Sequence, residues 1–544
     1  MFRILIMLNR CAAETTRKLC RNVIVFKDSQ VLNQLQYKNN VAQRIELPEQ
    51  TPSMKQINYI ESLDGLPNWT TVKNEILSYE GNIKHKNIDA VVLKMLVSKK
   101  NFTMAISFVE YLNSSNDELS LGSINAILNV YIELGKVKQL SKEQKKYILD
   151  TYDYLYKKYK VLNESTCESL LHVLCIINEW EKALKVLDDL LLTSVPTHSA
   201  YSTIVAALFK NNQKKLAFKL IDQSILHKRP LQDKAYDEWI QHILREYKSD
   251  NDIIKHIDEI FKYLATNWIT VTEITANRLR ELYVTLNWDG KLAKIRNTDG
   301  YCSNCKNVLN PLTLSDEEFN QLQNNVKDKL LVGSDLLMKS TPQELKRFLD
   351  FMDRSPSFDV VLDALNICYT LGKASKTNKL HYLDHIVEKF VRKNKKVLVI
   401  SRKHMLSWNK TLLQKIMYKA SGFFTDDMSE DDPFFIMAAI LSGPNTDLVT
   451  KDLLRTHKFN LMDENLKQLF IKWQWQHQWI LRINNMNKPV LMPPPKYAPC
   501  AQKDSDTWHI PYADLPMTVA MTDSRTILNT NTWLCLKEKK KTVE

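Results

Sequence analysis

The apolar residues of the first half of the chain recur at helical spacing. From about Asn87 to Leu244 this pattern continues, nearly free of glycine and proline. The pattern also repeats, because residues 182–188 align with residues 216–222 at a shift of 34. Looser copies lie near residues 89–112 and 123–160. One helix pair cannot bury its apolar face alone, so this repeat predicts an α-helical solenoid.

Two classes of solenoid share this repeat length. Tetratricopeptide repeats usually bind protein, whereas pentatricopeptide repeats bind single-stranded RNA, one base per repeat. The Trp-Leu-Gly-Tyr signature of the tetratricopeptide class is absent from this chain. The repeat length by itself leaves the two classes about equal, and a spacer that binds nothing is a third alternative. The basic charge and the acidic cluster described below favour RNA.

The pattern changes after residue 356, where short apolar segments alternate with helical ones. Strands are predicted at residues 358–362, 396–401, 422–424 and 447–450, with helices such as 380–391 and 434–441 between them. Such a βαβ succession predicts an α/β domain with a parallel sheet and helices on both faces. Active sites of these sheets lie at the carboxyl ends of the strands.

Four acidic residues are expected at that edge, and they form our candidate catalytic set: Asp363, Asp431, Asp432 and Asp452. Asp363 and Asp452 come just past a predicted strand. Asp431 and Asp432 precede Pro433 at a predicted helix start, so an acidic helix cap is the plain alternative for that pair. Carboxylate oxygens are the ligands that Mg²⁺ prefers. The set therefore predicts a site for two Mg²⁺ or Mn²⁺ ions that hydrolyses a phosphodiester.

Basic residues near these aspartates are candidates for phosphate contacts. Arg402 follows the second strand, and Arg455 and His457 follow Asp452. For each of them an ordinary surface position is the favoured alternative. Asp426 and Asp427 are interpreted as loop acids outside the catalytic set.

Composition narrows the possible partners. The chain has 544 residues, a net charge of +13 and a pI of about 9.0, which favours a nucleic acid or an anionic membrane surface as partner. A basic mitochondrial protein that binds neither is the plain alternative. With 10 glycines the chain shows no phosphate-binding loop. No apolar run reaches the roughly 18 residues of a membrane span.

The N-terminal segment is basic and almost free of acids. Residues 1–26 alternate arginines with apolar residues and contain Glu14 as the one acid. This pattern predicts a mitochondrial transit peptide, with a basic disordered tail as the alternative. Residues 27–86 contain several prolines and are predicted to be a linker with short helices.

A Cys-x-x-Cys turn at Cys302 and Cys305 supplies two thiolates. Structural zinc takes four ligands, and His509 and Cys535, each in a tryptophan-containing segment, are the candidates for the other two. A redox dithiol and unpaired buried cysteines are the alternatives. Around this turn, residues 270–272 and 283–286 are β-prone, and a helix is expected at Ser315.

These pieces together resemble the protein-only ribonuclease P family, in its animal mitochondrial form. The resemblance covers residues 87–536 and rests on residues 360–366, 429–433 and 449–457, with residues 301–305, 508–511 and 533–535 around the zinc candidates. It implies that the four aspartates hold the catalytic metal ions and that Cys302, Cys305, His509 and Cys535 hold one Zn²⁺. It also implies removal of the 5′ leader from precursor tRNA in the mitochondrial matrix, and two partner subunits, a tRNA methyltransferase and a short-chain dehydrogenase.

The resemblance implies a division of the chain into a pentatricopeptide solenoid, a central zinc domain in two halves and a metallonuclease domain of the NYN or PIN-like type. We expect the solenoid at 87–265, the zinc domain at 266–312 and 489–536, the nuclease domain at 313–488 and a basic tail at 537–544. Two residues depart from the family pattern: Thr456 stands where an aspartate is common, and Ala364 replaces a glycine, which is expected to narrow the approach to Asp363. A pentatricopeptide RNA-binding protein with an inactive nuclease domain, or a protein-binding adaptor, are the alternative functions.

Overall fold

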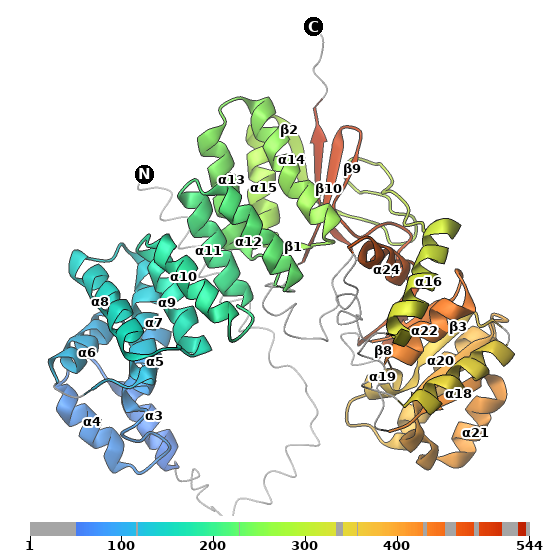
Figure 1. The fold of residues 1–544 in the computed structure, drawn as a ribbon, viewed down its shortest axis with the longest axis horizontal. Coiled ribbons are helices and arrows are strands. Elements are labelled where there is room, and N and C mark those ends of the chain that lie inside the picture. Colours follow the sequence, from blue (N-terminus) through green and yellow to red (C-terminus); the bar gives the residue numbers. More distant parts are fainter. Residues whose placement is uncertain are drawn as a thin grey trace, which may run out of the picture. The chain divides into compact units, whose positions relative to one another are not determined.

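The fold is described from a computed structural model (Figure 1). It describes residues 51–115, 118–227, 229–332, 341–355, 357–427, 432–451, 464–483, 489–513 and 531–539. The predicted transit peptide, Asp431, Asp452, Arg455, Thr456 and His457 lie outside the described residues. The chain divides into two compact units, Met1–Ser123 and Ile124–Glu544, and each is described by itself.

The first unit contains four described helices: α3 (Pro52–Ser62), α4 (Trp69–Ser78), α5 (Ile88–Ser98) and α6 (Phe102–Ser114). The first two are the short helices expected in the linker. Buried Gln56 joins them to the following segment, because its amide nitrogen donates to the carbonyl oxygens of Ile76 and Ile83 at 2.8 and 2.9 Å. A buried amide satisfied in this way fixes the packing of a small core.

A helical solenoid follows, as the repeat predicted: α7 (Leu121–Val137), α8 (Lys142–Lys158), α9 (Glu164–Ile176), α10 (Trp180–Leu191), α11 (His198–Lys210), α12 (Lys214–Leu226), α13 (Asp233–Glu246) and α14 (Asp250–Thr266). Its period is visible in the backbone. Asn178 and Asn212, one repeat apart, both turn the chain in the left-handed region, with φ of 69° and 59°. Asparagine tolerates this conformation better than most residues, so both helix pairs close with the same turn.

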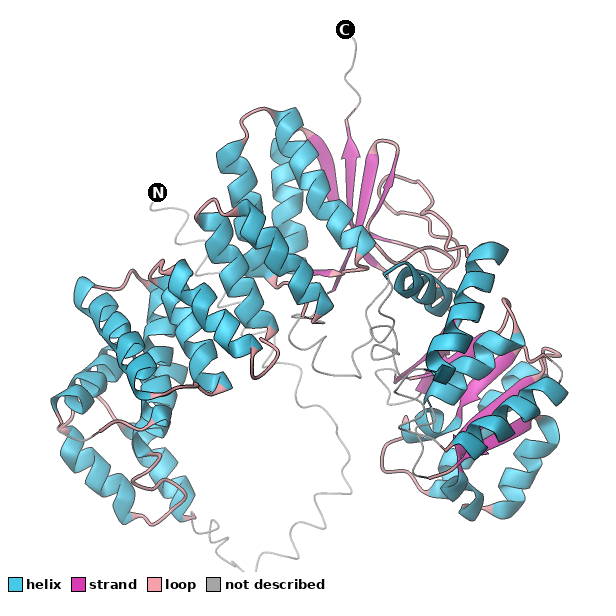
Figure 2. Cartoon of the chain, viewed as in Figure 1, coloured by secondary structure: helices cyan, strands magenta, loops and turns pink. Residues whose placement is uncertain are grey.

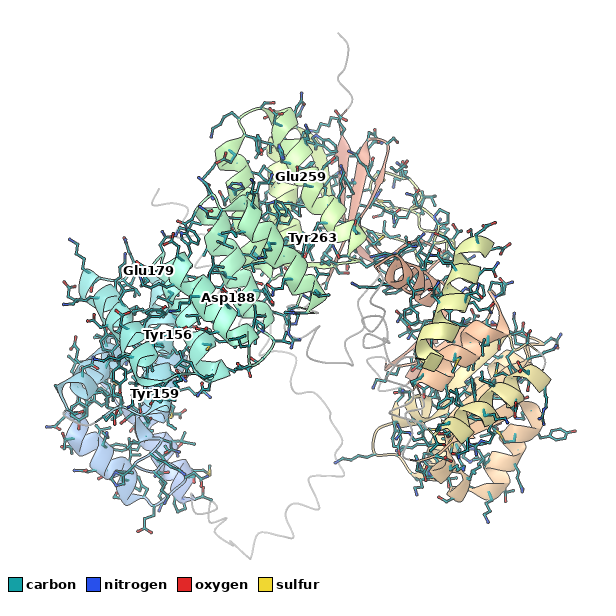
Figure 3. The ribbon with its side chains drawn as sticks, in the orientation of Figure 1. Tyr156, Tyr159, Glu179, Asp188, Glu259 and Tyr263 are labelled. Carbon is teal, nitrogen blue, oxygen red and sulfur yellow. The ribbon has the colours of Figure 1, made fainter. Side chains whose placement is uncertain are left out.

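Polar contacts tie neighbouring repeats together. The side-chain amides of Asn178 and Asn211 donate to each other at 3.1 and 2.8 Å. Lys214 on α12 forms an ion pair with Glu259 on α14 at 3.6 Å, and Glu259 is labelled in Figure 3. These contacts add to the apolar helix packing that holds a solenoid together.

A smaller sheet, whose strands are magenta in Figure 2, combines two distant parts of the sequence. Its strand order is β1 (Val271–Thr272), β10 (Thr507–Ala513), β11 (Thr532–Glu538) and β2 (Trp288–Lys294), with β9 (Gln502–Asp504) paired to β10. The prediction of β structure at residues 283–286 is wrong for most of this segment, because α15 (Glu273–Thr285) extends to Thr285 and buries Tyr283 completely. Thr272 caps this helix, and tertiary packing outweighs the β-propensity of its last residues.

The larger sheet has the predicted parallel arrangement. Its order is β5 (Ser421–Thr425), β4 (Val397–Arg402), β3 (Val360–Asp363), β6 (Asp447–Thr450), β7 (Gln478–Ile483) and β8 (Pro489–Met492), and only the β7–β8 pair among these is antiparallel. The four predicted strands are confirmed as β3 to β6. Residues 489–492, which we expected in the zinc domain, instead extend this sheet as β8. Pro489 opens an edge strand, a position where the missing N–H costs no ladder bond.

Helices cover both faces of the larger sheet (Figure 1). Val361 faces a core formed with α16 (Asp316–Val332), α18 (Pro342–Arg354), α22 (Asp432–Ser442) and α24 (Glu464–His477). Its neighbours Val360 and Leu362 face the other core, formed with α19 (Ala364–Tyr369), α20 (Lys376–Val391) and α21 (Lys410–Lys419). Burial on both faces explains why β3 is a continuous apolar run.

Helix α16 begins where the sequence predicts. The Ser315 N–H donates to the Glu318 carboxylate at 3.0 Å, and the Glu318 N–H donates to the Ser315 hydroxyl at 3.2 Å, which completes the capping box. Among the described helices, none combines the length and apolar character that crossing a membrane would require.

Candidate active site and metal centre

Asp363 lies at the carboxyl end of β3 in the middle of the larger sheet. Both neighbours of β3, β4 and β6, are parallel to it, so the ends of all three strands lie at one edge. Asp363 also caps the short helix α19. Its side chain is 3% exposed, which places a carboxylate just beneath the surface at the edge where sheets of this class bind ligands.

Neutral donors fix the orientation of this carboxylate. The Thr450 hydroxyl at the end of β6 donates to Asp363 Oδ2 at 2.8 Å. The Asn366 side-chain amide donates to the same oxygen at 2.5 Å, and the Asn366 N–H donates to Oδ1 at 3.1 Å. Sequence reasoning missed both partners. The position of Asn366, three residues after an aspartate cap, is a signal that could have identified it.

The remaining aspartates of the candidate set are placed in part. Asp432 opens α22, whose contact with β3 brings that helix beside the strand that carries Asp363. Asp452 follows β6 by two residues and Asp431 precedes α22 by one, and both lie outside the described residues, as do Arg455 and His457. The structure therefore brings Asp363 and Thr450 together, and it places Asp432 by its backbone alone.

Arg402 ends β4 at the same edge of the sheet. The adjoining loop acids have other partners: Asp426 pairs with Lys403 at 2.5 Å, and Asp427 accepts from the His404 backbone N–H and imidazole at 2.7 and 3.0 Å. The hydrogen bonds from His404 hold the pKa of Asp427 below its ordinary value. Both acids thus have structural partners, which agrees with their interpretation as loop acids.

A buried glutamate anchors this loop. Glu344 on α18 is 2% exposed, and its carboxylate accepts a hydrogen bond from the backbone N–H of Asp426 at 2.5 Å. Arg347 on the same helix donates to the carbonyl oxygen of Phe424 at 3.0 Å. Nothing in the sequence pattern signals this role, because it depends on the packing of α18 beside β5.

Two other residues near Asp363 are explained by burial. The side chain of Ala364 is completely buried in the apolar core under α19. Its methyl group therefore does not narrow the approach to Asp363, contrary to our expectation. Burial raises the pKa of the Cys368 thiol to about 12, so this thiol stays protonated at neutral pH and is no nucleophile.

The four predicted zinc ligands converge in the smaller sheet. The ligand atoms of Cys302, Cys305, His509 and Cys535 all lie within 4.8 Å of one another. His509 on β10 stands directly opposite Cys535 on β11, so the cross-strand register creates half of the cluster. Cys302, His509 and Cys535 are at most 1% exposed. Three thiols and an imidazole, most of them buried, match the donor set of a structural zinc site.

Hydrogen bonds couple the members of the cluster. Those from Cys305 and Cys535 lower the pKa of the Cys302 thiol, and those to Cys302 and Cys305 raise the pKa of the Cys535 thiol, so the thiolate is favoured at Cys302. Burial acts to lower the pKa of His509, but its hydrogen bonds to Cys302 and Cys305 raise that pKa to about 9. His509 Nδ1 is buried without a hydrogen-bond partner in the described part of the chain. The ring is therefore held through Nε2, which lies 3.3 Å from Cys305 Sγ.

Comparison with known proteins identifies the family. The family profile of protein-only RNase P matches residues 296–535. The mitochondrial ribonuclease P catalytic subunit of Mus musculus is 30% identical over 403 residues, which cover 72% of this chain and 67% of the mouse protein. The chain belongs to the protein-only ribonuclease P family. It is an endoribonuclease of tRNA 5′ processing.

More distant ribonuclease P proteins extend the comparison. Proteinaceous RNase P 1 of Arabidopsis thaliana, described as chloroplastic/mitochondrial, is 24% identical over 265 residues, or 46% of this chain and 42% of the plant protein. The crystal structure of nuclear proteinaceous RNase P 2 from A. thaliana superimposes with a TM-score of 0.49 at 16% identity, over 84% of this chain and 100% of the plant chain.

Proposed function

We propose that this ribonuclease P removes the 5′ leader of mitochondrial precursor tRNA by metal-dependent hydrolysis at the carboxyl edge of the larger sheet. The observation that carries the proposal is the buried Asp363 carboxylate, which Thr450 fixes from the neighbouring strand. Thr450 stands two residues before Asp452, and Arg402 ends the strand on the other side. Residues far apart in sequence are thus held at one edge.

In this proposal Asp363, Asp431, Asp432 and Asp452 hold two Mg²⁺ or Mn²⁺ ions. The donor set fits such ions, because carboxylate oxygens are hard ligands and several close carboxylates repel one another without a cation. When bound, the ions supply Lewis-acid stabilisation of the charge that develops on the phosphate and on the leaving oxygen.

The residues of the chain perform the remaining tasks. Thr450 and Asn366 keep the Asp363 carboxylate in one orientation, so the protein need not reorder it when substrate binds. Arg402, Arg455 and His457 are assigned to phosphate contacts near the scissile bond. Glu344 positions Asp426 and so the start of the loop that leads to Asp431 and Asp432.

The smaller sheet has a structural role in this proposal. One Zn²⁺ held by Cys302, Cys305, His509 and Cys535 would join the turn near residue 302 to β10 and β11, which lie about 200 residues away in sequence. Such a site contributes directly to the free energy of folding. The two halves of this domain, at 266–312 and from 493 to 536, would then form one body.

The solenoid is assigned to RNA binding of the pentatricopeptide kind, over residues 87–265. The net charge of +13 supports a polyanionic ligand. We further propose that the chain acts in the mitochondrial matrix after removal of residues 1–26, with a tRNA methyltransferase subunit and a short-chain dehydrogenase subunit as partners. The nuclease domain spans 313–492 and ends with β8 in this assignment.

The test is cleavage of a 5′-extended tRNA by the full chain, alone and with both partner proteins, in Mg²⁺ and in EDTA. We expect cleavage in Mg²⁺ that leaves a 5′-phosphate on the mature tRNA, and none in EDTA. Cleavage that persists in EDTA would overturn the metal mechanism. RNA affinity that does not fall with salt would instead favour a protein-binding adaptor.

A further inference from the structure

The positive charge of the chain is concentrated in one segment beside the candidate active site. Residues 364–425 contain thirteen lysines and arginines and two acids, a net charge of +11, whereas the whole chain carries +13. Both acids are already paired: Asp384 with Lys415 and Lys419 at 3.3 and 2.8 Å, and Glu388 with Arg392 at 2.8 Å. The segment therefore has no further carboxylate of its own to neutralise its remaining lysines and arginines.

The topology of the sheet brings part of this excess charge to the catalytic edge. Helix α20 starts soon after Asp363, and α21 starts soon after Arg402, so both helices begin at the carboxyl edge of the sheet and run away from it. Four lysines lie at these starts, and none pairs with a carboxylate of the described chain: Lys373, Lys376, Lys379 and Lys410. Lys389 lies in the last turn of α20 instead, and Lys393 lies just beyond its end.

An exposed aromatic ring stands among these lysines. Tyr369 is the last residue of α19 and is 52% exposed. The Lys379 ammonium lies 4.3 Å from the centroid of its ring. The largely buried Trp408 supports it edge-on, with centroids 6.3 Å apart and an interplanar angle of 84°, and Lys376 lies 5.8 Å from the Trp408 centroid. The packing holds Tyr369 in place while more than half of it remains in solvent.

We propose that Tyr369 and the lysines around it bind the single-stranded leader of the precursor immediately 5′ of the scissile bond. A base stacks on Tyr369, and Lys373 and Lys376 contact the neighbouring phosphates. Stacking on a side chain requires an unpaired base, and the leader supplies unpaired bases next to this bond. Tyr369 is six residues from Asp363, a rise of roughly 9 Å along a helix, so it is within reach of those nucleotides.

This inference rests on the proposed function and explains how leaders of different sequence can be accepted. Every base has a face that can stack on an aromatic ring, and a lysine that contacts a phosphate does not distinguish one base from another. The subsite therefore increases affinity for a leader without selecting one. A contact with the double-stranded body of the tRNA would not need an exposed ring.

The test compares the affinity of the full chain for one tRNA with a leader of about six nucleotides and for the same tRNA without a leader. The chain carries Asp432→Asn so that the precursor stays intact. We expect the leader to increase the affinity of the chain for the tRNA. Tyr369→Ala should reduce this leader-dependent gain in affinity by a factor of at least about five. Tyr369→Phe should retain it. Lys376→Ala should reduce the slope of log affinity against log salt by about 0.7 for the precursor.

Matched controls come from the same segment. Tyr418→Ala removes an even more exposed tyrosine, at 94%, from the far end of α21. Lys393→Ala removes a lysine beyond the far end of α20. Neither should alter leader-dependent affinity. The inference is overturned if the leader adds no affinity, or if Tyr369→Ala weakens both RNAs equally or neither. Failure of the proposed function would appear separately, as no cleavage by the chain with Asp432 intact.

Discussion

Replacing Thr450 with valine tests how the protein orients its candidate catalytic carboxylate. The change keeps the volume of the side chain and removes the hydroxyl that donates to Asp363 Oδ2 at 2.8 Å. Both residues are buried, at 0% and 3% exposure, so water cannot fully replace the lost donor. A hydrogen bond to a charged group contributes about 1.5–3 kcal/mol, and this sets the expected loss in the free energy of unfolding.

The larger effect is expected on metal dependence. Removing a residue that orients a metal ligand typically costs 10–100-fold in metal affinity. Thr450→Val should therefore shift the Mg²⁺ concentration for half-maximal cleavage upward by about that factor, with activity recovered at high Mg²⁺. The assay is leader cleavage across a Mg²⁺ titration, together with urea unfolding of the same protein.

Thr446→Val is the matched control. Thr446 directly precedes β6, is buried at 2% exposure, and donates to the carbonyl oxygen of Phe358 at 2.8 Å, at the other end of the strand. This variant should lose about 1 kcal/mol of stability without any change in Mg²⁺ dependence. If Thr450→Val leaves the Mg²⁺ dependence unchanged, or if Thr446→Val shifts it equally, then Thr450 does not orient Asp363 as a metal ligand.

Three further predictions concern other parts of the chain. Cys302→Ser should lower bound zinc from about one ion per chain to none and reduce the melting temperature, whereas an unchanged melting temperature would contradict a structural metal. Asp384→Asn should destabilise the protein at pH 7, because ion pairs with Lys419 and Lys415 lower the carboxyl pKa against the effect of burial. A carboxyl group whose pKa is lower in the folded state stabilises the protein at pH values above its pKa in the unfolded chain, and this stability is lost as the pH falls. The stability difference between Asp384→Asn and the unaltered protein should therefore shrink below about pH 4. Gln468→Ala removes hydrogen bonds to the Trp268 indole and the Thr266 carbonyl, at 2.8 and 2.7 Å, and should lower urea stability by about 1–3 kcal/mol while zinc content stays constant.

Periodic features of the fold were predictable from the sequence because they depend on local patterns. Helices α9 and α11 begin at Glu164 and His198, which are 34 residues apart. This spacing equals the shift that the apolar positions of the sequence predict. Strands β3 to β6 were predicted because burial on both faces leaves continuous apolar runs. Strand β7 was missed, since Gln478–Ile483 directly follows α24 and carries no turn signal before it.

Features that depend on distant packing were predicted less well. The β-prone residues near Tyr283 belong to a helix, because burial of this ring against Phe261 and Trp288 outweighs local propensity. His509 and Cys535 were candidates because each lies in a tryptophan-containing segment, and the family resemblance then supported them; ligands more than 200 residues from Cys302 have no local spacing rule. The structure shows why they meet, because the two residues are opposite each other across β10 and β11.

The roles of the aspartates remain predictions with a direct test. Leader cleavage and precursor affinity should be measured side by side for the unaltered chain and for Asp363→Asn and Asp432→Asn, in saturating Mg²⁺. These substitutions remove charge from the proposed metal ligands, whereas affinity comes mainly from contacts to phosphates. We expect both variants to lose cleavage while their affinity for the precursor stays nearly unchanged. Cleavage at the unaltered rate by either variant would contradict the proposed role of these aspartates.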